Sequence, residues 1–370
     1  MAKAKSRLHE LAAHGQSVWF DTLSRELIHS GELKKMMDED AVTGVTSNPT
    51  IFQKALSQGD AYDEDLKKLL EETDDPTEIF FSLALQDIRD ACDVLKPAYD
   101  ASNGIDGYVS MEVEPGIAYD TEKTFTQARW IAKEVDRPNL YVKIPATVPG
   151  LPAIEDCTAH GTSINITLIF SLDRYKAVVE AYIRGLERLV AGGGDPSKVV
   201  SVASFFVSRV DSEADKRLAA AGHEQLQGKL AVANAKLAYQ YFLEAFSGPR
   251  WEYLEGKGAN KQRCLWASTS TKNPDYRDVI YVEELIGPET VNTMPLETIR
   301  AFQDHGEVRG DTVLKGVKKA NELLVKLAEA GVDYDDVTET LEAEGVQKFA
   351  DSFDEIVESI RAKRSSLAAA

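Results

Sequence analysis

The chain has 370 residues, of which 43% are hydrophobic, and its formal net charge is −19. This length and composition suit one large α/β barrel or two smaller domains, and they exclude a disordered or fibrous protein. The acidic balance argues against a nucleic-acid partner, because binding to a phosphate backbone needs clustered positive charge.

Short apolar runs alternate with helical patterns along most of the chain. Eight runs are predicted to be strands, and most are rich in Val, Ile and aromatic residues, as strands buried on both faces are. In chain order they cover residues 17–21, 44–47, 108–113, 140–145, 163–170, 199–208, 264–269 and 279–286. Helical patterns between and after them cover residues 23–40, 61–72, 76–100, 172–190, 212–246, 315–331 and 337–364.

Two further segments are predicted to be a turn and a loop between these elements. Residues 192–197, GGGDPS, follow a helical pattern and precede a strand, which predicts a helix C-cap and turn and not a phosphate loop. Residues 248–263 are the best candidate for a long loop. No linker rich in Pro, Gly or Ser divides the chain.

Eight β-then-α units in a row predict an α/β fold, a single (β/α)8 TIM barrel. We expect one domain over residues 1–370, with the barrel at about 17–310, an N-terminal helix and a helical C-terminal segment at about 311–370. An open doubly wound sheet is the alternative, since periodicity does not separate the two. The count of eight and the missing G-x-G-x-x-G fingerprint favour the barrel.

The sequence gives no support for a disulfide-rich, membrane-spanning, secreted or zinc-binding protein. The cysteines, Cys92, Cys157 and Cys264, are too widely spaced for a disulfide framework, which favours a reducing, cytoplasmic setting. We expect no membrane span, because no apolar run reaches 18 residues, and no secretory signal, because the charged N-terminal stretch has no apolar core. The six histidines show no zinc-binding spacing, so no metal site is expected.

Polar residues recur where the predicted strands end, and in a barrel the carboxyl ends of the strands carry the chemistry. Seven of the eight predicted strands offer such a group near this rim. These candidates are Asp21, Asn48, Glu112, Lys143, Asn165, Thr167, Ser204, Arg209, Ser268 and Lys272.

Most of these residues also have a structural interpretation. Asp21 could cap a helix, Asn48 could form a turn with the following proline, and Ser204 could fill a tight barrel layer. Asn165 and Thr167 share one strand face and could bond to each other. By the same reasoning, Arg209 could form a surface ion pair with its neighbour at position 211.

Lys143 is the hardest to explain structurally, because it lies inside the apolar run LYVKIP. Lysine is rarely buried, although one at a strand end can extend its ammonium to solvent. Burial disfavours the charged form and leaves a free amine that can attack a carbonyl and form a Schiff base. Asp21 and Glu112 could move the protons that this chemistry needs.

The other candidates fit the binding of a phosphorylated sugar. Asn48, Asn165 and Ser204 could bind hydroxyl groups. Arg209, helped by Lys272, could hold a phosphate, because a guanidinium suits bidentate contact with such a group.

Seven motifs in chain order resemble those of the transaldolases, most closely the longer bacterial members. They are VWFDTLSR, GVTSNPTIF, SMEVEPGIAYD, LYVKIPAT, INITLIFS, SVASFFVSRVD and LWASTSTKNPDY. The resemblance implies an α/β barrel of the Schiff-base class I aldolase superfamily. It implies transfer of a dihydroxyacetone unit from sedoheptulose 7-phosphate to glyceraldehyde 3-phosphate, giving erythrose 4-phosphate and fructose 6-phosphate in the non-oxidative pentose phosphate pathway. It also implies action on sugar phosphates without a metal or organic cofactor. We expect a cytoplasmic protein that is a monomer or a homodimer.

The resemblance also implies a role for each matched position. Lys143 matches the Schiff-base lysine, and Asp21 matches the acid/base for carbon–carbon bond cleavage. Glu112 and Thr167 match the pair that holds a catalytic water. The remaining matches are substrate contacts: Asn48, Asn165 and Ser204 around the dihydroxyacetone unit, and Arg209 and Ser268 near the phosphate.

One motif departs from the shorter transaldolases. Residues 267–273 read ASTSTKN, which is longer and places Lys272 where an arginine is expected. A lysine holds phosphate as a point charge and lacks the bidentate fork, so phosphate affinity could differ.

Three alternatives stay open on the sequence alone. The chain could be a Schiff-base aldolase that releases free dihydroxyacetone, or a non-catalytic barrel that binds sugar phosphates. A lysine could also serve pyridoxal phosphate, although no phosphate cup is evident beside Lys143. The helical segment from about residue 311 could shield the barrel mouth, since it follows the last barrel unit.

Overall fold

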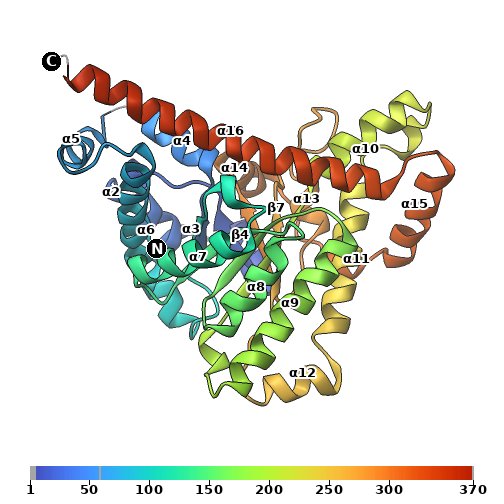
Figure 1. The fold of residues 1–370 in the computed structure, drawn as a ribbon. Coiled ribbons are helices and arrows are strands. Elements are labelled where there is room, and N and C mark those ends of the chain that lie inside the picture. Colours follow the sequence, from blue (N-terminus) through green and yellow to red (C-terminus); the bar gives the residue numbers. More distant parts are fainter. Residues whose placement is uncertain (1–5, 58–59, 369–370) are drawn as a thin grey trace, which may run out of the picture.

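The structure is a computed structural model that describes residues 6–57 and 60–368. Residues 1–5 of the predicted N-terminal helix and residues 369–370 of the predicted tail lie outside the described residues. Eight parallel strands form a closed barrel in sequence order, and β8 pairs with β1 to complete it (Figure 1). The strands are β1 Gln16–Phe20, β2 Val42–Thr46, β3 Val109–Glu112, β4 Leu140–Pro145, β5 Ile164–Ile169, β6 Ser201–Phe206, β7 Arg263–Ala267 and β8 Thr290–Met294. The prediction of an α/β (β/α)8 barrel is therefore confirmed.

Helices surround this barrel and extend beyond it. In the described part of the chain they are α1 Arg7–Ala13, α2 Arg25–His29, α3 Glu32–Asp40, α4 Pro49–Ser57, α5 Asp63–Glu72, α6 Pro76–Ala101, α7 Thr121–Val135, α8 Gly150–Ala159, α9 Leu172–Ala191, α10 Ser208–Ala220, α11 Leu230–Ala245, α12 Gly248–Glu255, α13 Ile280–Glu284, α14 Leu296–His305, α15 Val317–Glu329 and α16 Tyr334–Ala368. Short 3-10 helices lie at Pro115–Ile117, Pro196–Lys198, Glu224–Leu226 and Thr312–Leu314. None of the helices in the described ranges has the length and hydropathy needed to cross a bilayer.

The predicted eighth strand is wrong. Residues 279–286 form α13 and its flanking turns, and the strand lies further on, at Thr290–Met294. Val279, Val282 and Ile286 are fully buried, and their spacing of three and four residues is that of one helix face. The composition of the true strand does not predict a buried strand, because it carries polar residues such as Asn292. This residue is buried and accepts a hydrogen bond from Thr269 at 2.8 Å.

The loop predicted at residues 248–263 is also wrong in its first half, which forms α12. Trp251 and Leu254, which are three residues apart and so lie on one face of this helix, are buried. The Trp251 ring meets Phe246 edge to face, with 4.8 Å between ring centroids. The turn predicted at residues 192–197 is confirmed, because α9 ends at Ala191 with Gly192 as its C-cap.

Large side chains fill the barrel interior below the rim. Trp19 of β1 and Tyr141 of β4 belong to distant strands, yet their ring centroids are 5.9 Å apart, so both point inward. Tyr108 stacks on Tyr141 at 4.2 Å. Because side chains alternate along a strand, Lys143 points inward as Tyr141 does, one layer nearer the carboxyl end. Gly44 is required beside Trp19, since a Cβ there would lie 2.5 Å from the indole.

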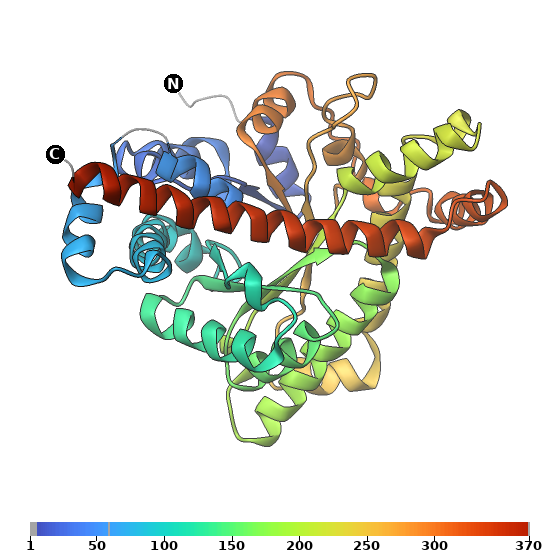
Figure 2. The ribbon, with the colours of Figure 1, turned by 45° about the horizontal axis from the view of Figure 1, so that its top comes forward.

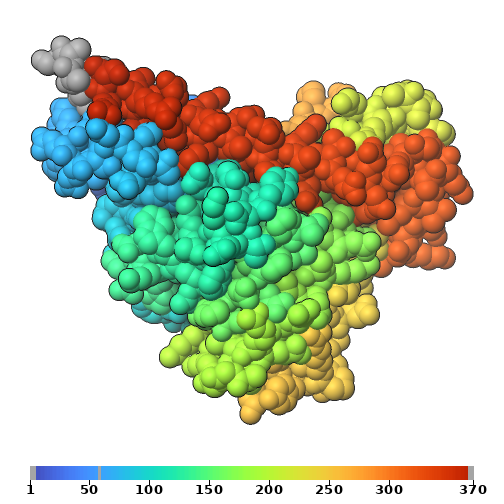
Figure 3. Space-filling view, viewed as in Figure 1, coloured from blue at the N-terminus to red at the C-terminus, as the bar shows by residue number. Residues whose placement is uncertain are grey.

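The C-terminal helix α16 runs the width of the molecule and crosses the barrel mouth (Figure 2). In the space-filling view it forms a continuous ridge over the segments beneath it (Figure 3). Phe353 on its inner face packs edge to face on Phe80 of α6, with 5.3 Å between centroids. Ser352 shares a hydrogen bond of 2.7 Å with Thr50 at the start of α4. These contacts fix the helix against the rim.

Candidate active site

A cavity of about 560 Å³ opens at the carboxyl ends of the strands, where the sequence predicts the chemistry. Its wall comes from the strand ends, from the loops that follow them, and from helices α4 and α16. Eight of the ten predicted site residues line it: Asp21, Asn48, Lys143, Thr167, Ser204, Arg209, Ser268 and Lys272. The other two, Glu112 and Asn165, lie directly behind this wall and bond to residues in it.

Lys143 lies at the floor of the cavity and is only 6% exposed. Its Nζ donates a hydrogen bond of 2.7 Å to the carbonyl oxygen of Ser47. The same nitrogen lies 3.2 Å from Oε2 of Glu112. Strand register explains this pair, because Glu112 of β3 and Lys143 of β4 are direct cross-strand partners. The lysine therefore does not extend to solvent, as the structural interpretation would require.

Glu112 is held on its other side by β5. Thr167 donates a hydrogen bond of 3.0 Å to Oε1 of Glu112, and both residues are buried. Next to Thr167 the register of β5 and β6 shifts, and Leu168 adopts a φ of 58°. Such an irregularity re-aims side chains at the rim of a barrel. The amine, the carboxylate and the hydroxyl thus converge from three neighbouring strands.

Asp21 follows β1 and faces the cavity from the other side of the barrel. Thr46 donates a hydrogen bond of 2.6 Å to Oδ1 of Asp21, and the Thr46 hydroxyl lies 2.7 Å from that of Thr293. Burial raises the pKa of the Asp21 carboxyl, while Thr46, Lys143 and Arg209 act in the opposite direction. The residue does not cap a helix, because the N-cap of α2 is Ser24.

The hydroxyl-binding candidates differ in their surroundings. Asn165 bonds to Ser204 at 2.6 Å and to Ser110 at 3.2 Å, and not to Thr167. The Oδ1 of Asn48 accepts from the Ile51 amide at 3.0 Å and so caps the first turn of α4. Asn48 therefore caps the helix that begins at Pro49 and does not form the expected turn, and its side chain also borders the cavity.

The cationic side of the cavity contains Arg209 and Lys272. The Arg209 guanidinium lies over the Phe206 ring, 5.1 Å from its centroid, and does not pair with Asp211. Burial lowers the pKa of Arg209, and burial together with the Arg209 charge lowers the pKa of Lys272. Lys272 donates to Ser270 at 2.8 Å. Ser268 bonds to Ser208 at 2.9 Å and has a φ of 56°, a strained conformation typical of functional loops.

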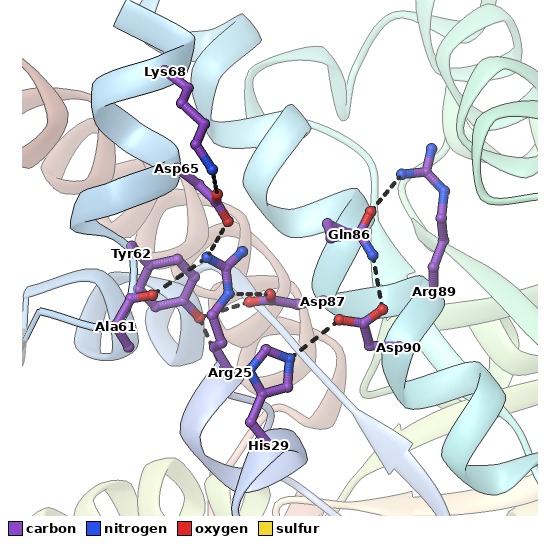
Figure 4. A network of polar contacts seen from close by, with 10 residues as sticks. All are labelled: Arg25, His29, Ala61, Tyr62, Asp65, Lys68, Gln86, Asp87, Arg89 and Asp90. Carbon is purple, nitrogen blue, oxygen red and sulfur yellow. Dashed lines mark hydrogen bonds and ion pairs between the residues drawn. The ribbon is translucent and has the colours of Figure 1, made fainter.

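A buried ionic network supports the loop that follows Asp21 (Figure 4). Arg25 donates to Asp87 at 2.9 Å and to Asp65 at 2.8 Å, and Tyr62 donates to Asp87 at 2.7 Å. These contacts join α2 to α5 and α6. Because Ser24 lines the cavity one residue before Arg25, the network holds this side of the cavity wall in place.

Sequence reasoning missed several lining residues, most notably Lys54 of α4 and Lys348 of α16. Their helical periodicity does not say which face points to the cavity, so no local signal identified them. No group of three or more His, Cys, Asp or Glu side chains within residues 6–57 and 60–368 is arranged to hold a metal ion.

Fold and cavity together define a class: a (β/α)8-barrel enzyme with its polar site at the carboxyl ends of the strands. A family model described as Transaldolase/Fructose-6-phosphate aldolase matches residues 18–360. A transaldolase of Parafrankia sp. (strain EAN1pec) is 53% identical over 98% of this chain and 99% of its own length. Transaldolases of Frankia alni and Mycolicibacterium paratuberculosis are 51% and 50% identical over at least 95% of either chain. The chain belongs to the transaldolase/fructose-6-phosphate aldolase family.

Proposed function

We propose that this protein is a transaldolase that transfers a dihydroxyacetone unit between sugar phosphates through a Schiff base on Lys143. The observation that carries the proposal is the buried Lys143 amine, which faces the cavity 3.2 Å from the Glu112 carboxylate. The reaction that the resemblance implies, from sedoheptulose 7-phosphate to glyceraldehyde 3-phosphate in the pentose phosphate pathway, suits this site. The cavity offers one nucleophile, Lys143, together with the Asp21 carboxylate and several cations, and Glu112 lies directly behind its wall beside Lys143.

In the first step, the Lys143 amine attacks the C2 carbonyl of the ketose and gives a carbinolamine. Protonation of its hydroxyl releases water and leaves an iminium ion. Glu112 and Thr167 are placed to hold the water that carries these protons, since their own hydrogen bond fixes the carboxylate beside Nζ.

In the second step, Asp21 removes the proton of the C4 hydroxyl as the C3–C4 bond breaks. The bonding electrons move into the iminium and give an enamine, and the aldose leaves with its new aldehyde. The raised pKa of Asp21 suits a group that takes up this proton and later returns it. Attack of the enamine on an acceptor aldehyde reverses these steps, and hydrolysis then frees Lys143.

Borohydride trapping tests the proposal. With fructose 6-phosphate, sodium borohydride should reduce the imine to a stable secondary amine, detected by mass spectrometry on the Lys143 peptide. Lys236 provides a matched control, because it is also buried and also pairs with a glutamate, Glu284 at 2.9 Å, away from the cavity. The Lys143→Met variant should give no adduct and Lys236→Met should give the normal one. A wild-type protein without an adduct at Lys143 would contradict the proposal.

An aldolase that releases free dihydroxyacetone is the second candidate, because the family description also names fructose-6-phosphate aldolase. The two activities differ in the partner with which the enamine reacts. In transfer the enamine attacks an aldose, and in release it takes up a proton from water. Product formation from fructose 6-phosphate should therefore require an added acceptor aldose. Equal turnover without the acceptor would favour release.

The free thiols support a proposed location in the cell. Cys92, Cys157 and Cys264 are unpaired and buried, which supports the reducing cytoplasm as the place of action. Either a monomer or a homodimer is compatible with a cavity built within one chain. Cell fractionation and sedimentation measure these two properties.

A further inference from the structure

We propose that Lys348 of the C-terminal helix α16 is a ligand of the substrate phosphate, so that α16 completes the phosphate site. The inference rests on the proposed function, since it names a residue that would recognise the phosphorylated end of the sugar. It concerns a segment that follows every strand of the barrel.

The position of Lys348 is set by contacts of its neighbours on α16. Gly345 lies so close to the irregular part of β5 that a Cβ there would be 3.0 Å from the Leu168 side chain. Phe349 is 4% exposed and lines the cavity, as Lys348 does. Further along, Phe353 packs on Phe80. The helix is thus anchored on both sides of Lys348, and its side chain is directed to the rim of the cavity.

The charged side chains that line this cavity are mostly cationic, although the molecule as a whole is acidic. The chain has a net charge of −19, yet five cationic side chains and two carboxylates line the cavity. The cations are Lys54, Lys143, Arg209, Lys272 and Lys348, and the carboxylates are Asp21 and Glu297. A local reversal of sign in an acidic protein is a feature that attracts and concentrates an anion.

Lys348 belongs to this cationic group and not to an ion pair. None of the ion pairs that α16 makes within the described ranges involves Lys348. Burial lowers the pKa of Lys348, and so do the charges of Arg209, Lys272 and Lys54. Glu344 and Asp21 act in the opposite direction on Arg209. Mutual repulsion among these cations is unfavourable, and a dianion placed between them would relieve it.

The chemistry of the group fits a phosphate monoester. Arg209 offers a planar fork for two oxygens, whereas Lys272 and Lys348 offer point charges for the remaining oxygen. Lys143 is buried at the floor and the cations lie toward the mouth, so a sugar can present its carbonyl to one and its phosphate to the other. Lys348 would then supply charge that Lys272, as a lysine in place of arginine, does not supply alone.

The test compares Lys348→Gln with a control on the same helix. Arg361 is 61% exposed, pairs only with Glu358 among the described residues and does not line the cavity, so Arg361→Gln removes the same charge without touching the site. We would measure kcat/KM for glyceraldehyde 3-phosphate and for unphosphorylated glyceraldehyde as acceptors, and the Ki of inorganic phosphate. A charged hydrogen bond is worth about 1.5–3 kcal/mol, so the ratio of the two kcat/KM values should fall roughly 10-fold or more in Lys348→Gln.

The same variant should weaken inhibition by inorganic phosphate by a similar factor, and Lys348→Arg should restore most of both. An unchanged ratio and Ki in Lys348→Gln, or an equal loss in Arg361→Gln, would overturn the inference. Failure of the proposed function is separate, because it is measured by borohydride adduct formation on wild-type Lys143. A variant that traps the adduct with fructose 6-phosphate at saturating concentration is folded, so a lowered ratio then reports phosphate recognition.

Discussion

Replacing Asp211 by asparagine should remove a large pH dependence of stability. This carboxyl lies in α10, two residues after Arg209, and is 1% exposed. It accepts hydrogen bonds from the Ala231 amide at 2.7 Å and from Tyr281 at 2.9 Å. Burial raises its pKa to about 7 from an ordinary value of 3.8. Asparagine has the same shape: its Oδ1 can still accept from the Ala231 amide, and its Nδ2 can donate to the Tyr281 hydroxyl oxygen, so the variant removes the charge and keeps both residues in contact.

The sign follows from proton binding. Between pH 4 and 7 folded Asp211 is protonated while the unfolded chain has released its proton, so stability falls as pH rises. From pH 5 to pH 8 this one group should lower the free energy of unfolding by about 2–3 kcal/mol. Above about pH 8 both states are ionised and the loss is complete.

The assay is urea unfolding of wild type and Asp211→Asn at several pH values. Using the difference between the two proteins cancels the contributions of the other carboxyls. The asparagine variant should gain about 2–3 kcal/mol relative to wild type between pH 5 and pH 8. Asp354→Asn, which removes an exposed carboxyl of α16, should show no such gain. A flat difference for Asp211→Asn would refute the reasoning.

Two further substitutions test the site and its support. Asp21→Asn should lower kcat about 10²–10⁴-fold while the borohydride adduct on Lys143 still forms; the wild-type rate should rise with pH through the raised pKa of Asp21, and the variant should lose that rise. Arg25→Met should cost about 3–5 kcal/mol of unfolding free energy, because it leaves the Asp87 carboxylate buried without its cation. Lys34→Met, which removes one partner of an exposed ion pair, should cost less than about 1 kcal/mol. Equal effects of the two substitutions would contradict this assignment.

Much of the site followed from local pattern. A lysine inside an apolar strand is rare, because burial of its charged amine is unfavourable, and this drew attention to Lys143. The period of two along a strand then places Lys143 on the same face as Tyr141. The dense apolar runs gave seven of the strands, since strands buried on both faces have a distinctive composition. What pattern does not contain is the register between strands, which decides that Glu112 is the partner of Lys143.

The errors have physical causes too. Thr290–Met294 is a strand whose polar side chains are buried in the barrel, where Asn292 accepts from Thr269 and Thr290 donates to Gly287, so its composition does not look like a core. The run at residues 279–286 is apolar because it covers the barrel from outside as a helix. Lys348 depends on where a 35-residue helix crosses the rim, which is a tertiary fact and leaves no trace in its own sequence.

The pairing of Glu112 with Lys143 also bears on how the barrel assembles. If β3 slipped by one residue against β4, Met111 or Val113 would stand beside the Lys143 amine, and the Glu112 side chain would turn outward among the helices. Either slip would bury two charges without partners, at a cost of several kcal/mol. The two residues proposed to begin the reaction therefore also penalise misaligned pairings, and they help to select the one alignment in which the barrel closes.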